Sequence, residues 1–107
     1  MSPETPPHRT DRFDETVHQR NRLGILAFLS SVDRAEFTTV RNQLGLTDGN
    51  LNRHLALLAD ASYVEISKPA TEGSRARTWI ALTPTGRRAL TAHIQALQAL
   101  IDSVPPS

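Results

Sequence analysis

The sequence predicts an α+β domain that is mainly helical, and three features of the chain support this class. Helical apolar patterns occupy most of residues 13–104, while the strand-like segments are short. A helix that starts near residue 48 follows the preceding helix after a turn of about three residues. Two strand-like runs with a basic loop between them come directly after that helix. This order predicts a winged helix-turn-helix with long N- and C-terminal dimerisation helices.

The chain is 107 residues long and 38% hydrophobic, which predicts one small domain, of a size that association with a second copy helps to stabilise. Residues 1–12 contain three prolines and few apolar groups, so we expect a disordered tail there, a domain over 13–104 and a second tail over 105–107. The chain has no cysteine, which excludes disulfides, a thiol redox sensor and cysteine metal sites. The polar, proline-rich start is no secretory signal and no apolar run reaches membrane-spanning length, so we expect a cytoplasmic protein.

The first half of the domain predicts two helices and a short strand. A helix over about 14–30 is apolar on all sides, so it must be covered both by its own core and by a partner. Residues 35–37 predict a strand that adds to the sheet of the wing. Thr38 is the expected N-cap of a helix over 39–44, and Gly45 can take the left-handed conformation that ends this helix.

The next helix, which we call the recognition helix, has one apolar and one polar face. Thr47 is its expected N-cap, and a stripe of leucines at spacings of four and three forms the buried face (Leu51, Leu55 and Leu58). Its exposed first turns carry small or hydrogen-bonding side chains, and Asn and Arg can pair with the edges of adenine and guanine. We therefore expect four side chains near base edges: Asn50, Asn52, Arg53 and His54. We expect three residues at the helix N-terminus to lie near phosphate: Thr47, Asp48 and Gly49. The carboxylate of Asp48 would repel a phosphate, so it either caps the helix or accepts from a cytosine amino group.

The wing is the predicted hairpin formed by residues 64–68, a loop, and residues 78–82. Lys68, Arg75 and Arg77 place three cations on or beside this hairpin, where they can reach backbone phosphates or the minor groove. The alternative is that these cations only provide solubility. Trp79 and Leu82, on the second strand, are expected in the core. The net charge is only +1, so nonspecific DNA affinity should be modest and specific contacts must supply much of the binding.

The last helix is expected from Pro84 to about Val104, with Thr83 as its N-cap. Its apolar side chains recur at spacings of four, three, four and three, which is the seam of a coiled coil (Leu90, Ile94, Leu97, Ile101 and Val104). We interpret Leu90, Ile94, Leu97 and Ile101 as a homodimer interface; the alternative is a helix that folds back on its own domain. A two-fold dimer would separate two recognition helices by about one DNA turn, roughly 34–36 Å, and require an inverted-repeat operator.

Three segments also carry a family resemblance: LGLTDGNLNRHL at 44–55, ASYVE at 61–65 and RTWIALTPTGR at 77–87. They resemble the small stand-alone winged-helix transcriptional regulators related to the MarR and ArsR groups, of the type with the signature LTDGNLxRHL. The resemblance implies a dimeric, cytoplasmic protein that binds specific double-stranded DNA, and we expect a repressor. Ser62 departs from the family pattern, which usually has glycine there, so Ser62 must adopt the backbone conformation of that glycine.

Other functional classes fit the sequence less well. A winged-helix protein-interaction module without sequence-specific DNA binding would favour an apolar or acidic recognition face, whereas Asn52, Arg53 and the basic wing are polar or cationic. No nucleophile, base and orienting group recur at useful spacing and there is no glycine-rich phosphate loop, so we expect no enzyme. The four histidines, at positions 8, 18, 54 and 93, are scattered without carboxylates at ligand spacing, so we expect no metal and no cofactor. A small-molecule effector is compatible with the sequence, but no residue pattern indicates one. His18 and His93 would make the dimer sensitive to pH if they met across its interface.

Overall fold

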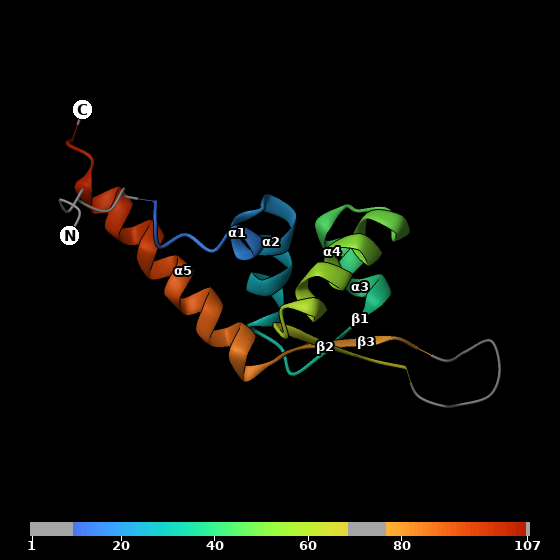
Figure 1. Cartoon of the computed structure of the whole chain (residues 1–107). Helices are drawn as coiled ribbons and strands as arrows, with labels where there is room; N and C mark the ends of the chain where they lie inside the picture. Colours follow the sequence, from blue (N-terminus) through green and yellow to red (C-terminus); the bar gives the residue numbers. More distant parts are fainter. Residues whose placement is uncertain (1–9, 69–76, 107) are drawn as a thin grey trace.

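The computed structural model describes residues 10–68 and 77–106 and confirms a mainly helical α+β fold (Figure 1). Its elements follow the chain as α1 (Glu15–His18), α2 (Arg20–Leu29), β1 (Ala35–Glu36), α3 (Phe37–Leu44), α4 (Asp48–Asp60), β2 (Val64–Ser67), β3 (Trp79–Leu82) and α5 (Pro84–Ser103). α3 and α4 form the helix-turn-helix, and α4 is the recognition helix. In Figure 1, α5 runs along one edge of the molecule, α1 and α2 lie beside it, and α3 and α4 lie on the far side.

The sheet has three antiparallel strands in the order β1-β3-β2. Ala35 of β1 and Ile66 of β2 both pair with Ile80 in the centre of β3. The short strand predicted before α3 therefore does join the sheet of the wing. The β2–β3 pair points away from α5 (Figure 1), so the wing and the dimer helix predicted from the sequence extend in different directions.

The hydrophobic core lies between α2, α4 and the sheet, and α5 closes one side. α1, α3 and α5 contribute Val17, Val40 and Leu90, while Ile80 of β3 is fully buried beneath the helices. The remaining large members come from α2 and α4, and they are Ile25, Leu26, Leu29, Leu51, Leu55 and Leu58. The leucine stripe predicted on the recognition helix is thus the part of α4 that holds it to the domain.

Four predicted backbone features are confirmed. Thr47 and Thr83 cap α4 and α5, and their hydroxyl oxygens accept hydrogen bonds from the amides of Asn50 (3.1 Å) and Gly86 (2.9 Å). Gly45 ends α3 in the left-handed region, with φ 64°. Ser62 also has a positive φ, 65°, so it does take the conformation for which glycine is usual.

The single helix predicted over 14–30 is wrong, because the chain breaks at Gln19. This residue has an extended backbone, with φ −57° and ψ 131°, and it separates α1 from α2. Its side-chain oxygen accepts from the amides of Asn21 (2.9 Å) and Arg22 (3.0 Å), so Gln19 caps the second helix. Glutamine is not among the preferred N-cap residues, which explains why the sequence pattern did not indicate the break.

The predicted start of α3 is also wrong. The helix begins at Phe37, two residues before the expected start at Thr39, and Thr38 is not its cap. Its N-cap, Glu36, makes no capping hydrogen bond through its side chain. The amide of Phe37 instead donates to the carbonyl of Thr78 (2.9 Å), so the adjoining sheet satisfies one of the free amides at this helix start.

Trp79 is half-buried rather than part of the buried core. Successive side chains of a strand point to opposite faces, and Ile80 takes the position that faces the core. The indole instead lies beneath Arg34, whose guanidinium carbon is 4.0 Å from the ring centroid. Leu82, the other residue expected in the core, is half-buried and packs against the core cluster.

Part of the predicted N-terminal tail is placed by the structure. Residues 10–12 form a turn in which the amide of Phe13 donates to the carbonyl of Thr10 (3.0 Å). The disorder predicted over 1–12 is therefore wrong for residues 10–12, and residues 1–9 lie outside the described part of the chain.

Candidate nucleic-acid interface

The exposed face of α4 carries most of the side chains that the sequence assigns to DNA. Because its leucine stripe is buried, the other side of the helix is open to solvent. This face starts at the helix N-terminus, where free backbone amides favour an anion. Thr47, Asp48, Gly49, Asn50, Asn52 and Arg53 are all exposed. In Figure 1, α4 lies away from α5, so the end of the molecule that holds these residues is distinct from the long C-terminal helix.

A salt bridge accounts for the carboxylate of Asp48 at this surface. Its Oδ1 atom accepts from Arg41 of α3 at 2.7 Å, and Arg41 Nε donates to Asn42 (3.2 Å). Asp48 is also the first residue of α4, where a negative charge interacts favourably with the helix dipole. The carboxylate therefore pairs with a cation of the preceding helix, and its position holds Arg41 beside the N-terminus of α4.

Asn50 and Arg53 are linked on the exposed face. Arg53 donates through one terminal nitrogen to the Asn50 side-chain oxygen at 3.3 Å. Residues three apart lie on neighbouring positions of a helix surface, so this contact holds both side chains on the same side of α4. The remaining guanidinium donors of Arg53 face solvent and are available for hydrogen bonds to acceptors on a base.

His54 does not belong to the exposed face, so the sequence-based assignment of this residue to base edges is wrong. Only 5% of its surface is exposed, and its ring contacts the side chains of Arg22 (Nδ1, 3.2 Å) and Asn21 (Nε2, 3.4 Å) on α2. Burial, together with the charges of Arg22 and Arg53, lowers the pKa of His54 below its ordinary value. The signal was present in the sequence, since position 54 lies three residues after Leu51 and so falls on the edge of the buried stripe.

A groove separates α4 from the base of the wing. It has a volume of about 400 Å³, and Asn52 and Ala56 of α4 face Ile66 and Lys68 of the hairpin across it. Lys68 is exposed, so a predicted wing cation and a predicted base-contacting residue border the same groove.

Of the other two predicted wing cations, Arg77 lies in the described part of the chain. Arg77 donates to the carboxylate of Glu36 at 3.1 Å, which holds its guanidinium beside β1. Arg75 lies outside the described residues.

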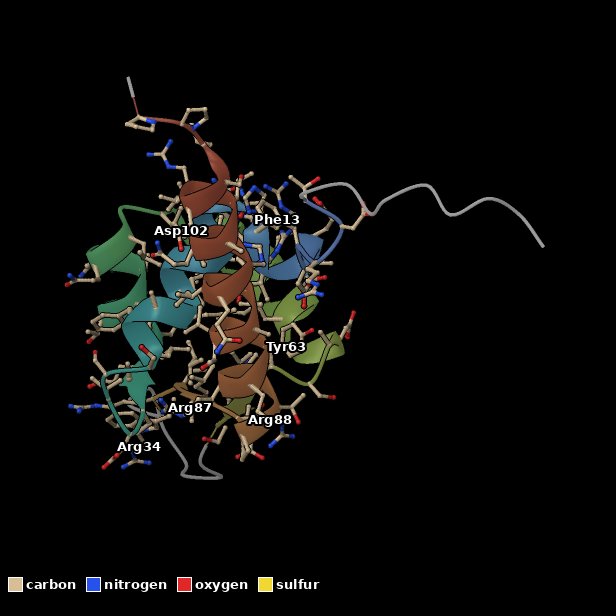
Figure 2. The ribbon with its side chains drawn as sticks, turned by 90° about the vertical axis from the view of Figure 1, so that its left-hand side faces the viewer. Phe13, Arg34, Tyr63, Arg87, Arg88 and Asp102 are labelled. Atoms are coloured by element: carbon tan, nitrogen blue, oxygen red, sulfur yellow. The ribbon has the colours of Figure 1, made fainter. Side chains whose placement is uncertain are left out.

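The predicted dimer seam on α5 is divided between the core and the solvent. Leu90 is buried in the core of its own domain, so its assignment to a dimer interface is wrong, and Leu97 is half-buried. By contrast, Ile94 and Ile101 are 50% and 62% exposed. Figure 2 shows α5 in front of the domain, with no other described element covering its outward face. From Ile94 onwards the seam therefore presents large apolar side chains to solvent, whereas Leu90 at its N-terminal end is buried.

His18 and His93 meet within one chain and not across an interface, contrary to the arrangement needed for a pH-sensitive dimer contact. Their ring nitrogens Nδ1 and Nε2 are 3.0 Å apart, and Phe13 packs against both rings. The amide of Asp14 donates to the other ring nitrogen of His93 (3.2 Å), while Tyr63 donates to the Asp14 carboxylate (2.6 Å). Figure 2 shows Phe13 and Tyr63 along the same side of α5. Sequence reasoning did not identify this network, which joins α1 and the turn after α4 to α5.

The described residues also bear on metal and membrane binding. Within 10–68 and 77–106, no three His, Cys, Asp or Glu side chains lie close enough together to hold a metal ion. None of the helices in the described segments is long and apolar enough to cross a membrane.

Comparisons with known proteins agree with this geometry. A family model described as a winged helix DNA-binding domain matches residues 21–101. An uncharacterized protein of Methanocaldococcus jannaschii is 36% identical over 83 residues, which cover 78% of this chain and 89% of that protein. The structure of a transcriptional regulator homologue from Pyrococcus horikoshii is 31% identical and superimposes with a TM-score of 0.76, covering 82% of this chain and 86% of the other.

A more distant structure shares the fold alone. A zinc-responsive MarR family member from Lactococcus lactis superimposes with a TM-score of 0.58 at 18% identity. The match covers 79% of this chain and 57% of the Lactococcus protein.

Proposed function

Because the chain belongs to the winged helix DNA-binding domain family, we propose that it is a homodimeric repressor that binds an inverted-repeat operator. Its family and MarR-like fold are those of DNA-binding transcriptional regulators and not of enzymes. The observation that carries the proposal is the exposed polar face of α4, which begins at a capped helix N-terminus and borders the wing across one groove. Such a regulator acts where the chromosome lies, so we assign it to the cytoplasm.

In this proposal, α4 enters the major groove with its N-terminal half towards the bases. Asn50, Asn52 and Arg53 read base edges, because amide and guanidinium groups match the acceptors and donors of adenine and guanine. Thr47 and Gly49 lie at the free amides of the helix start, where a backbone phosphate is favoured. Arg41, held by Asp48, reaches a phosphate beside the same helix end.

The wing supplies contacts that do not depend on sequence. Lys68 is exposed at the edge of the groove beside α4, so its charge can approach the DNA backbone next to the bases that α4 reads. We assign Arg75 and Arg77 to the same role, in which Arg77 exchanges its contact with Glu36 for a phosphate.

The dimer is formed by α5. Ile94 and Ile101 lie on one side of the helix at a heptad spacing, and Val104 extends the same exposed strip. Pairing with a second copy would remove these side chains from water, which is favourable in proportion to the apolar area buried. A two-fold axis through α5 would present two copies of α4 to two half-sites of an inverted repeat.

Selection of bound sequences from a random duplex pool tests this function. We expect the wild-type chain to select an inverted repeat. Replacement of Arg53 by alanine should cost about 1–3 kcal/mol at one position of each half-site and relax the preference there. Replacement of Lys68 and Arg77 by alanine should weaken binding evenly across sequences, because phosphate contacts carry no sequence information.

The matched control is Arg88→Ala, which removes the same charge from an exposed position of α5. It should leave the selected sequence unchanged. A wild-type chain that selects no motif even at low salt would contradict the proposed function and would favour a protein-interaction module instead.

A further inference from the structure

We infer that His54 is a positioning residue for DNA recognition, which fixes the rotation of α4 about its own axis and so decides which side chains of α4 face the bases. This inference rests on the proposed function for its consequence in DNA binding. The contacts that carry it lie on the hidden side of the helix, between α4 and α2, and none of them involves a residue of the exposed face.

A continuous set of hydrogen bonds connects three helices through Arg22. Its Nε atom donates to the carbonyl of Thr16 in α1 (2.7 Å), and one terminal nitrogen lies 3.2 Å from His54 Nδ1. The backbone amide of Arg22 donates to the Gln19 side chain, which caps α2 (3.0 Å). Because the guanidinium is held at both ends, it is a fixed reference point for α4. The Asn21 side chain contacts the other side of the ring, with its Nδ2 atom 3.4 Å from His54 Nε2.

The chemistry of this contact allows one protonation state of the ring. A guanidinium has only donors, so His54 Nδ1 must accept from Arg22 and the neutral ring carries its proton on Nε2. The protonated Nε2 is a donor, so the Asn21 amide must turn its oxygen, in place of Nδ2, towards the ring to accept from it. Protonation of Nδ1 would place an N–H donor of the ring against the N–H donor of Arg22. The groups that face the ring are Asn21 and Arg22 of α2, with Arg53 nearby on α4, and none of them is a carboxylate that would stabilise a charged imidazole. Burial and the two arginines lower the pKa of His54, so the ring remains an acceptor at neutral pH.

The leucine stripe does not define this rotation by itself. Hydrophobic burial has no preferred direction, so Leu51, Leu55 and Leu58 stay buried over a range of helix rotations. Side chains extend to about 5–6 Å from the axis of a helix, so a rotation of about 20° moves an exposed side chain by about 2 Å. A hydrogen bond spans a range of only about 0.5 Å. The directional contact at His54, on the edge of the stripe, therefore decides whether Asn52 and Arg53 reach their bases.

Three variants of the full chain separate the acceptor from the volume of the ring. His54→Asn keeps an acceptor near the position of Nδ1, His54→Leu fills the site without an acceptor, and Arg22→Met removes the donor but keeps an apolar stem. Leu58→Val is the matched control, because it loosens the packing of α4 without changing the contact between Arg22 and His54. For each variant, the measurement is the ratio of affinities for the selected operator and for its single-base variants.

We expect the loss of the acceptor or donor to reduce discrimination and not only stability. In His54→Leu and Arg22→Met the affinity ratio should fall by about tenfold, which lies within the range of discrimination that one well-made base contact provides. His54→Asn should retain the ratio to within about threefold, and Leu58→Val should lower the Tm while leaving the ratio unchanged. Wild-type discrimination in His54→Leu, or an equal loss in Leu58→Val, would overturn the inference.

NMR of the free protein tests the positioning role without DNA. The nitrogen shifts of the His54 ring should show a bare Nδ1 and a protonated Nε2 at neutral pH. Residual dipolar couplings should show a different orientation of α4 relative to α2 in His54→Leu, but not in His54→Asn. A protonated Nδ1, or the same α4 orientation in His54→Leu as in wild type, would overturn the inference. If the wild type selects no operator, the proposed function fails and the NMR data still decide whether His54 positions α4.

Discussion

Asp14 makes hydrogen bonds to three different parts of the fold. One carboxylate oxygen caps α1 by accepting from the amides of Thr16 (2.9 Å) and Val17 (3.3 Å), and the other accepts from the Tyr63 hydroxyl. Its own amide donates to His93. Asp14, the residue that precedes α1, therefore joins this helix to α5 and to the turn after the recognition helix.

The titration of Tyr63 measures this connection, because Tyr63 is the single tyrosine of the chain. The hydrogen bond to Asp14, together with burial and the nearby carboxylate charge, raises the pKa of Tyr63 to about 12. We expect Asp14→Asn to return the pKa of this phenol towards about 10. Absorbance of the phenolate follows the titration, and circular dichroism confirms that the chain is folded. A raised pKa that persists in Asp14→Asn would contradict the assigned cause.

His93 is 1% exposed and should make the free energy of unfolding depend on pH. Burial and the neighbouring His18 lower its pKa, and Asp14 and Glu15 oppose this shift. The folded pKa is thus below the value of 6.5 in the unfolded chain, so the unfolded state binds more protons. Stability should be fully present above pH 6.5 and should fall as the pH drops below it. Urea unfolding at a series of pH values gives the free energy of unfolding as a function of pH. Below pH 6.5 this free energy should change less steeply with pH in His93→Gln than in wild type, and an unchanged steepness would contradict this prediction.

At the scale of elements, α5 starts directly on the turn that follows α4. The Thr83 hydroxyl donates to the carbonyl of Ser62 (2.6 Å), and the Thr83 amide donates to the carbonyl of Tyr63 (3.0 Å). The positive φ of Ser62 shapes this turn. The start of the predicted dimer helix is thereby attached to the end of the recognition helix, so the angle of α5 and the position of α4 are structurally linked.

Gly86 is required for this attachment. A Cβ atom at residue 86 would lie 2.1 Å from the carbonyl oxygen of Tyr63, which is backbone and cannot rotate away. Gly86→Ala should lower the free energy of unfolding by about 1–3 kcal/mol, the usual cost of overpacking. The control is Gly49→Ala, since a Cβ there meets no atom within 4 Å and alanine should stabilise the helix by up to about 1 kcal/mol. Denaturant unfolding distinguishes the two, and equal effects would contradict the close approach.

The salt bridge between α3 and α4 should reduce nonspecific DNA binding. Asp48 neutralises Arg41 at the proposed phosphate site, so Asp48→Asn should release this cation and remove a repulsive charge. We expect a higher affinity for random duplex DNA. The slope of the logarithm of this affinity against the logarithm of the salt concentration should become steeper by about one unit. Asp60→Asn, an exposed change of the same charge at the other end of α4, is the control. Equal changes in both variants would mean that only the net charge matters.

At the scale of the whole molecule, the exposed strip on α5 is central to the proposed dimer. A glutamate at residue 101 would place a charge among apolar side chains at the interface, whereas Ile101 is 62% exposed in a single chain and is not needed for its core. Ile101→Glu should therefore sediment as a folded monomer and lose most of its affinity for an inverted repeat, since only one half-site can be held. Gln95→Glu adds the same charge at an exposed position on another face of α5 and should remain dimeric. A dimeric Ile101→Glu chain would contradict this interface.

The fold could be predicted from the sequence almost completely, and the exposed polar face of α4 in large part. The order of helices and strands, the leucine stripe of α4 and the caps at Thr47 and Thr83 are confirmed. The errors are of a different kind. The break at Gln19 and the early start of α3 both depend on hydrogen-bond partners that a local pattern does not contain. The spacing correctly placed Leu51, Leu55 and Leu58 on the buried side of α4. It placed His54 on the exposed side, whereas this polar side chain occupies the edge of the buried stripe.

Local sequence patterns were sufficient for features whose causes lie within a few residues: helical periodicity, the threonine caps and the left-handed Gly45. Which polar groups meet depends instead on the three-dimensional packing of the elements. His54 pairs with a residue 32 positions away, Tyr63 with one 49 positions away, and His93 with His18 over 75 positions. A buried polar group must find a hydrogen-bond partner wherever the packing of the core places one, and that packing depends on all elements together. For this reason the exposed recognition face could be read from its spacing, while the contacts that hold and orient it could not.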